Sequence, residues 1–285
     1  MGFRRVCGAM AAALMSIVAS PAGAQSVLLQ IRPRVGDTLR VQLEQQVEMT
    51  GMPQGCGAGQ QIGLRARVKG SPANCSDTRT MTTRMEVYSR AIARRATHDA
   101  TDILAITDSV LTSTEKRGPL HHATNQPLQR APVEIRIASD GEVEVGAGPA
   151  SDEMRTLLGQ MPATLSRKAV TVGEKWIHEM RVPLAREPGA TGLVRTTFQL
   201  DSLGRGGDIA YISMHGSLTH EHANGSNSET SGSLTGSMRF DRRRGWITDT
   251  HAMIDVWSEV ASTSSRKPME VHTRVVQSLH VSGDR

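Results

Sequence analysis

Aromatic side chains are scarce in this sequence. Its 285 residues include three Phe, three Trp and two Tyr. Proteins that bind single-stranded nucleic acids use aromatic rings that stack on the bases, together with a concentrated basic surface. The formal net charge here is only +5, and acidic residues are interleaved with the basic ones. We therefore expect no nucleic-acid binding.

Long apolar runs are also missing, apart from one near the N-terminus. Two arginines, Arg4 and Arg5, precede the short apolar run Ala9–Ala19. The small residues Ala22–Ala24 then form a typical cleavage site. This pattern predicts a secretory signal peptide over residues 1–24, because the run is too short for a membrane-spanning helix. A retained anchor, and twin-arginine export in place of general secretion, stay open as alternatives.

The rest of the chain contains no apolar stretch that approaches the roughly 18 residues of a membrane-spanning helix. We expect an exported bacterial protein that does not span the membrane after signal cleavage. Its location would be periplasmic or extracellular.

Cysteine is rare, with three residues in all, and two of them follow the predicted signal peptide. In an exported protein such a pair usually forms a disulfide, so we expect a bond between Cys56 and Cys75. It would close a Gly-, Pro- and Arg-rich loop over residues 56–75 and stabilise the fold by about 2–4 kcal/mol. A two-thiol metal site and a redox pair are the alternatives, but neither C-x-x-C spacing nor a nearby histidine supports them.

Catalytic motifs are absent from the sequence. It has no G-x-S-x-G elbow, no Walker loop and no H-E-x-x-H motif. The glycine-rich stretches at 146–149 and 204–208 lie between expected strands, whereas phosphate-binding glycines precede a helix. We therefore expect no catalytic residues and no cofactor.

Apolar and polar residues alternate over most of residues 25–285, which is typical of strands with one buried face. The alternating runs lie at 39–49, 81–93, 103–111, 176–182, 193–200, 209–222, 234–240, 246–260 and 269–281. Two short alternating arms also surround Ser139-Asp140-Gly141, which predicts a hairpin. The pattern predicts a mainly β protein with a single domain over residues 25–285. Its core would be a large curved antiparallel sheet, shaped as a half-barrel or open barrel.

One segment has the period of a helix instead. Met154, Leu157, Leu158 and Met161 recur at i, i+3, i+4 and i+7, behind a Ser residue that can cap the helix and ahead of a Pro residue that ends it. We expect one amphipathic helix over residues 151–161 that covers an end or a face of the sheet.

Two histidines, His220 and His222, flank Glu221 near the end of an expected strand. Strand geometry places both imidazoles on the face that carries Ile212 and Met214, which suits a pair of metal ligands. A metal site needs further ligands, and only a remote loop with the histidines at 121–122 offers them. We expect a polar strand end and no bound metal.

The absence of further ligands follows from a specific strand register, in which Met214 pairs with Phe240. This register also pairs Gly216 with Met238 and Leu218 with Gly236, so that large residues lie opposite small ones. Phe240 then faces Trp246 across the next turn. In this register Leu234 and Gly232 lie beside the two histidines, and no further residue that could bind a metal lies there.

The stretch Pro162–Met180 resembles a P…V-x-V-G-x-x-W signature of secreted bacterial β-rich proteins. In that family, as here, a hairpin follows (Phe198–Tyr211) and then an F-D-x-x-x-G sequence (Phe240–Gly245). The family has no established activity. It is similar in expected shape to the half-barrels of LolA-like lipoprotein carriers, whose concave apolar face holds acyl chains. The loop between the two cysteines departs from this pattern.

These observations lead to the hypothesis of an exported, non-enzymatic protein that binds an apolar or lipid-like ligand, or a partner, on a curved sheet. The candidate residues for the ligand-binding face are Met81, Met85, Ile212, Met214, Met238 and Phe240, and Met253 is another methionine placed inward. Methionine adapts to irregular apolar groups, although core packing explains these positions equally well. The alternatives are a structural or interaction protein of the cell envelope and a metal-dependent hydrolase that uses His220 and His222.

Overall fold

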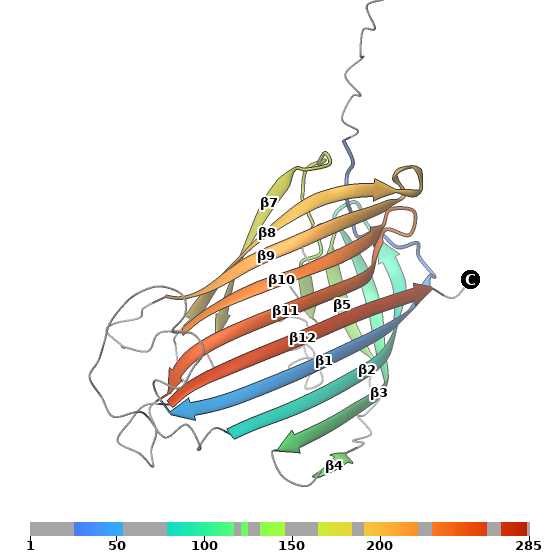
Figure 1. Cartoon of the computed structure of the whole chain (residues 1–285). Helices are drawn as coiled ribbons and strands as arrows, with labels where there is room; N and C mark the ends of the chain where they lie inside the picture. Colours follow the sequence, from blue (N-terminus) through green and yellow to red (C-terminus); the bar gives the residue numbers. More distant parts are fainter. Residues whose placement is uncertain are drawn as a thin grey trace, which may run out of the picture.

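The structure is a computed structural model that describes residues 26–53, 79–116, 121–124, 132–145, 165–183, 191–221, 230–260 and 269–283. The predicted signal peptide, the loop between Cys56 and Cys75 and the predicted helix at 151–161 lie outside these residues. Twelve strands make up almost all of the described chain (Figure 1). They are β1 (Thr38–Pro53), β2 (Arg79–Ala96), β3 (Ala100–Lys116), β4 (His121–Thr124), β5 (Val133–Ala138), β6 (Val143–Val145), β7 (Lys175–Pro183), β8 (Thr191–Gly204), β9 (Ile209–Glu221), β10 (Thr230–Asp241), β11 (Trp246–Val260) and β12 (Met269–Gly283).

All strands belong to one curved antiparallel sheet (Figure 1). The strand order is β6-β5-β3-β2-β1-β12-β11-β10-β9-β8-β7, with β4 added to β3. Among the described residues no pairing joins the edge strands β6 and β7, so the sheet is open. This confirms the predicted fold class and the expected hairpin, in which Gly141 adopts a positive φ of 92°.

Helical structure in the described part of the chain is limited to one 3-10 turn at Arg205–Gly207. None of the described helices is long and apolar enough to cross a membrane.

The sheet has a buried face and a polar face, as strand β10 shows. Leu234, Met238 and Phe240 are buried, and the residues between them, such as Ser237 and Arg239, are exposed. Because successive side chains of a strand point to opposite sides, the period-two pattern of the sequence becomes two different surfaces. We call the buried side the concave face and the polar side the convex face.

The segment before β1 covers one end of the concave face. Its apolar side chains Val27, Leu29 and Ile31 are almost completely buried in the main core cluster. Burial of each contributes at most about 1.5–3 kcal/mol. Backbone hydrogen bonds fix the segment: Ile31 N donates to Ser139 O and Arg32 N to Gly245 O, both at 2.8 Å. We call the end of the sheet beneath this segment the closed end.

Residues 165–174 join the same end of the fold. Val27 and Val170 exchange backbone hydrogen bonds of 2.8 Å, and Gly173 N donates to Leu200 O of β8 at 2.7 Å. This segment therefore connects the first described residues to the β8 side of the sheet, so the closed end is held from both sides.

An ion pair attaches the β5–β6 hairpin to residues 165–174. Arg167 Nε lies 2.6 Å from Asp140 Oδ2, and Glu142 N donates to Asp140 Oδ1 at 3.2 Å. Burial of the Asp140 carboxyl raises its pKa, but these two hydrogen bonds and the charge of Arg167 outweigh burial and hold the pKa below its usual value. The ionised carboxylate is therefore favoured in the folded state.

Replacing Asp140 by Asn is expected to lower the free energy of unfolding by about 1 kcal/mol at neutral pH, a value discounted because Arg167 is largely exposed. Since folding lowers the pKa, the carboxylate stabilises the protein above the unfolded pKa of about 3.9, and this contribution is lost as the pH falls through the folded pKa. Urea unfolding at several pH values measures the difference in the free energy of unfolding between the original protein and Asp140→Asn. A difference in the free energy of unfolding that persists in strong acid would contradict the prediction. Glu134→Gln, at an exposed position of β5, serves as the control.

The predicted register between β9 and β10 is wrong by four residues, although the assignment of faces is right. Met214 pairs with Gly236 rather than with Phe240, and Phe240 pairs with Ala210. A shift by an even number leaves every side chain on its face, so alternation alone does not distinguish the two registers. The observed register still pairs large residues with small ones, as in Leu234 opposite Gly216.

The predicted contact across the next turn is also wrong. Phe240 pairs with Ile247, and Trp246 pairs with Asp241, because the register shifts between Arg239 and Phe240. Such a β-bulge adds one residue to one strand, which a strictly alternating pattern does not reveal. The inward placement of Met253 is wrong as well, since this residue pairs with Thr235 on the convex face and is 36% exposed.

Candidate functional site: the concave face

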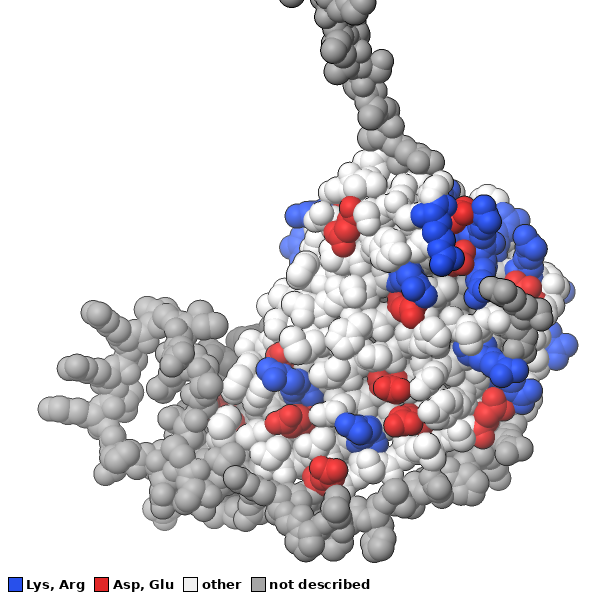
Figure 2. Space-filling model, turned by 45° about the vertical axis from the view of Figure 1, so that its right-hand side comes forward, with Lys and Arg blue, Asp and Glu red and all other residues white. Residues whose placement is uncertain are grey.

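Charged side chains are missing from the central rows of the concave face. One row of paired residues runs from β7 to β3 through Trp176, Phe198, Met214, Gly236, Ala252, Gln277, Gln45, Met85 and Thr112. The next row towards the closed end runs from β8 to β3 through Leu200, Ile212, Met238, Thr250, Leu279, Leu43, Val87 and Val110. Neither row contains Asp, Glu, Lys or Arg. The outer surface, in contrast, carries interspersed charges of both signs (Figure 2).

A cavity of about 160 Å³ lies against this face, near the closed end. It is bordered by Ile31 of the N-terminal segment, by Trp246 and Ile247 at the start of β11, and by apolar residues of β1, β2, β3, β5, β6 and β12. None of its lining residues is charged. An apolar pocket of this kind gives a small apolar group a place to bury its surface.

Small side chains explain why space remains at this point. Ala91 of β2 pairs with Ala105 of β3, and the neighbouring Ser89 pairs with Val41 of β1. Beside them lie Ile135, which pairs with Ile103 of β3, and other residues of the β5–β6 hairpin. Two facing alanines leave a gap that the larger residues around them do not fill, because each side chain is held in its own strand position.

The six candidate residues for ligand binding all occupy the concave face, but their burial differs. Ile212, Met214, Met238 and Phe240 are at most 2% exposed and belong to the packed core cluster. Met81 and Met85 are half-buried, in the part of the face that lies away from the closed end. Residues on either side of these methionines in neighbouring strands, such as Met49 and Val47, are half-buried too. The concave face is therefore a filled core at one end and a less covered apolar surface at the other.

The sequence interpretation did not find the residues that line the cavity. Its ligand-face candidates were large apolar residues, whereas the space arises beside the small residues Ser89, Ala91 and Ala105. The available signal was the occurrence of small residues at inward positions of two consecutive strands. That signal becomes informative only when the pairing of β2 with β3 is known.

The histidine pair is only partly described. His220 pairs with Gly192 on β8, and Leu218, two residues earlier, pairs with Gly232 on β10. His222 lies outside the described residues, and so does the side chain of His220. Within the described ranges, no three His, Cys, Asp or Glu side chains come together in a way that would hold a metal ion.

Comparisons with known proteins show what the fold is similar to. No protein-family model matches the chain, and no curated protein sequence does. The family resemblance at Pro162–Met180 therefore stays a prediction. A solved structure that concerns lipid–protein interactions in lipovitellin matches 87% of this chain with a TM-score of 0.50 and 13% sequence identity.

The match covers 25% of the lipovitellin chain, so this chain spans about a quarter of that protein. An outer membrane channel from Pseudomonas putida F1 matches 92% of this chain and 99% of its own at 9% identity, but the TM-score of 0.26 supports no argument. The comparisons thus show a sheet architecture shared with part of a lipid-binding protein.

Proposed function

We propose that this protein binds an apolar, lipid-like ligand against the concave face of its sheet, with one end of the ligand in the cavity near the closed end. The observation that carries this proposal is the apolar cavity beside Ala91 and Ala105, next to the two uncharged central rows of the concave face. A charged ligand group would lose its hydration there without gaining a partner, whereas an acyl chain would gain about 25 cal/mol for each Å² that it buries.

The half-buried residues on the same face extend this surface away from the cavity. Met81, Met85 and Met49 can adjust their conformations to a chain of irregular shape, because methionine is unbranched and flexible. A ligand with a polar group would place that group away from the closed end. This arrangement matches the expected behaviour of an exported lipid carrier, and it requires no catalytic residue.

Native mass spectrometry of the full chain purified from cells tests the proposal directly. The expected result is an additional mass that organic solvent extracts and that corresponds to a lipid. Delipidated protein should then bind a fluorescent fatty acid. Protein that carries no lipid and gives no fluorescence change with apolar probes would refute the proposal.

The cavity provides a specific variant. Replacing Ala105 by Phe fills the space between β2, β3 and the β5–β6 hairpin, and we expect it to weaken binding of the fluorescent fatty acid by about tenfold, or about 1.4 kcal/mol. The matched control is Leu104→Phe, which adds an aromatic ring to the convex side of the same strand. Equal binding by both variants would show that the cavity is not the ligand site, and circular dichroism verifies that each variant folds.

A further inference from the structure

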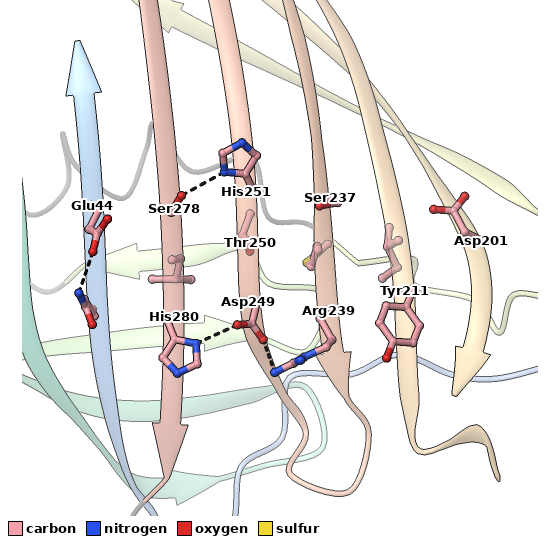
Figure 3. A pocket seen from close by; sticks show the side chains of 14 residues that line it. Glu44, Asp201, Tyr211, Ser237, Arg239, Asp249, Thr250, His251, Ser278 and His280 are labelled. Carbon is pink, nitrogen blue, oxygen red and sulfur yellow. Dashed lines mark hydrogen bonds and ion pairs between the residues drawn. The ribbon is translucent and has the colours of Figure 1, made fainter. Parts of the chain in front are cut away.

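The convex face contains a groove of about 400 Å³ that the proposed lipid site does not use. It extends across β8, β9, β10, β11, β12 and β1, and polar side chains point into it from all six strands (Figure 3). Its character is opposite to that of the concave cavity. An acyl chain would have to desolvate these polar groups, so the groove requires a different class of ligand.

One row of paired residues forms the length of the groove and continues beyond it. The row contains Tyr211, Arg239, Asp249, His280, Gln42 and Tyr88. Both tyrosines of the chain belong to this row, which continues beyond them to Ser202 of β8 and Ser109 of β3. Five strand-to-strand steps of about 4.8 Å separate the two tyrosines, so they lie about 24 Å apart along the row.

Hydrogen bonds and an ion pair hold the middle of this row. Arg239 Nη2 lies 2.5 Å from Asp249 Oδ2. His280 Nδ1 lies 2.8 Å from Asp249 Oδ1, and since a carboxylate only accepts, the imidazole donates. At the far end Gln42 Nε2 donates to Tyr88 Oη at 3.4 Å. The polar groups are thus oriented before any ligand arrives.

A second polar row runs parallel to the first. It consists of Ser213, Ser237, His251, Ser278 and Glu44. Ser213 Oγ donates to Asp201 Oδ1 at 2.9 Å, and His251 Nδ1 lies 3.0 Å from Ser278 Oγ. Together the two rows offer a long surface on which hydrogen-bond donors and acceptors alternate.

Two β-bulges explain why the convex face is hollowed here. The register shifts between Leu200 and Ser202 where β8 meets β9, and between Arg239 and Phe240 where β10 meets β11. Both lie beside the first polar row. Bulges bend a strand and redirect its side chains, and they often occur next to functional sites.

Tyr211 lies at the β8 end of the groove and is 44% exposed. Its ring lies against Gly204: a Cβ added to that glycine would be 3.0 Å from Tyr211 Cε2 and 3.6 Å from Tyr211 Oη. The glycine therefore lets the aromatic ring lie along β8, so that a flat apolar surface borders the polar rows.

The charges of the groove exclude several ligands. Three carboxylates, Glu44, Asp201 and Asp249, line it beside a single guanidinium, and Arg239 already pairs with Asp249. A phosphate or another strong anion would therefore be repelled. No three of the described His, Cys, Asp or Glu side chains form a metal site. Donors and acceptors alternate along both rows, which favours a neutral, hydroxyl-rich molecule that does both over an organic cation that only donates.

We propose that this groove binds a neutral oligosaccharide that lies across the strands, with one sugar ring stacked on Tyr211. Hydroxyl groups of the sugar would donate to Asp201, Glu44 and the free Nε2 of His280, and would accept from the Tyr211 hydroxyl. The apolar C–H face of a sugar ring packs against an aromatic ring, and the remaining sugar rings follow the row towards Tyr88. The protein would then bind a lipid-like ligand on one face and a glycan on the other.

Fluorine NMR tests this proposal, because the chain has only two tyrosines. Full-length protein labelled with 3-fluorotyrosine gives two signals, which Tyr88→Phe and Tyr211→Phe assign. The probes are cellobiose, cellohexaose, maltohexaose and chitohexaose at millimolar concentration. We expect at least one hexasaccharide to move both signals and the disaccharide to move that of Tyr211 alone.

Four variants test whether the ring of Tyr211 is the contact. Tyr211→Ala should weaken binding of the active hexasaccharide at least about tenfold, which corresponds to about 1.4 kcal/mol. Tyr211→Phe keeps the ring and should retain most of the affinity. Gly204→Ala should weaken binding by displacing the ring, and Ser217→Ala, outside the groove on the same face of β9, should leave it unchanged.

The proposal is overturned if no neutral hexasaccharide moves either signal while circular dichroism shows folded protein. It is equally overturned if only anionic polymers bind, or if Tyr211→Ala binds as the original protein does. None of these results depends on the lipid site, because lipid binding is measured by mass spectrometry and fatty-acid fluorescence.

Discussion

Replacing Phe198 by Ala is expected to lower the free energy of unfolding by about 3–5 kcal/mol. Phe198 is completely buried on the concave side of β8 and pairs with Met214 of β9. Its ring also stacks on Trp176 of β7, with 5.7 Å between the ring centroids and an angle of 11° between the planes. Removal of the ring leaves a cavity between β7, β8 and β9 that these strands cannot close without breaking their pairing.

Guanidinium unfolding, followed by tryptophan fluorescence and by circular dichroism, measures this effect. Ile177→Ala is the matched control, because Ile177 belongs to the neighbouring strand but is 53% exposed on the convex side. The control should change the free energy of unfolding by no more than about 0.5 kcal/mol. A loss below about 1 kcal/mol for Phe198→Ala would contradict a packed core at this end of the sheet.

Replacing Gly245 by Ala is expected to destabilise the protein by about 2–4 kcal/mol and to loosen the segment before β1. Gly245 has a φ of +59°, which residues other than glycine rarely adopt. A Cβ at this position would also collide with the Arg32 carbonyl group and lie 2.9 Å from Arg32 N. The Arg32 N–H donates to the Gly245 carbonyl oxygen where the segment before β1 crosses the turn before β11. The new methyl group would force these two segments apart at this crossing, which closes the end of the sheet.

Gly206→Ala separates the strain from the collision. Gly206 has a similar φ of +67°, but nothing lies within 4 Å of the position that its Cβ would take. The free energy of unfolding of this variant should therefore fall only by the cost of the backbone conformation, about 1–2 kcal/mol. Hydrogen exchange at the Ile31 and Arg32 amides should accelerate in Gly245→Ala and stay unchanged in Gly206→Ala. Equal behaviour of the two variants would show that the crossing contributes nothing to stability.

The Gly245 prediction concerns the end of the molecule beneath which the proposed ligand cavity lies, whereas Phe198 lies away from that cavity. Ile31 lines that cavity and belongs to the segment that Gly245 holds in place. Opening the crossing is therefore expected to alter the cavity as well as stability. Gly245→Ala should weaken fatty-acid binding, whereas Phe198→Ala, on the β7–β9 side, acts mainly on stability.

The polar groove was not predicted from the sequence, for an identifiable reason. Tyr211, Arg239, Asp249 and His280 are far apart along the chain, and each occurs as an ordinary polar residue on the outer side of a strand. Their alignment depends on three strand pairings and on the bulge at Arg239. The histidines that the sequence analysis selected belonged instead to one short segment, because a short spacing is visible without knowledge of any pairing.

The amino-acid sequence alone determined most of the described strands and the two faces of the sheet. Alternation is a local property, since neighbouring side chains of a strand point to opposite sides whatever their partners are. The segments β1, β2, β3 and β7–β12, and the turn at Gly141, follow from this pattern. The tertiary structure alone decided which residues face each other. The register of β9 on β10, the cavity beside Ala91 and Ala105 and the alignment of the groove depend on strand pairing, bulges and the crossing at Gly245, where residues distant in sequence compete for the same space.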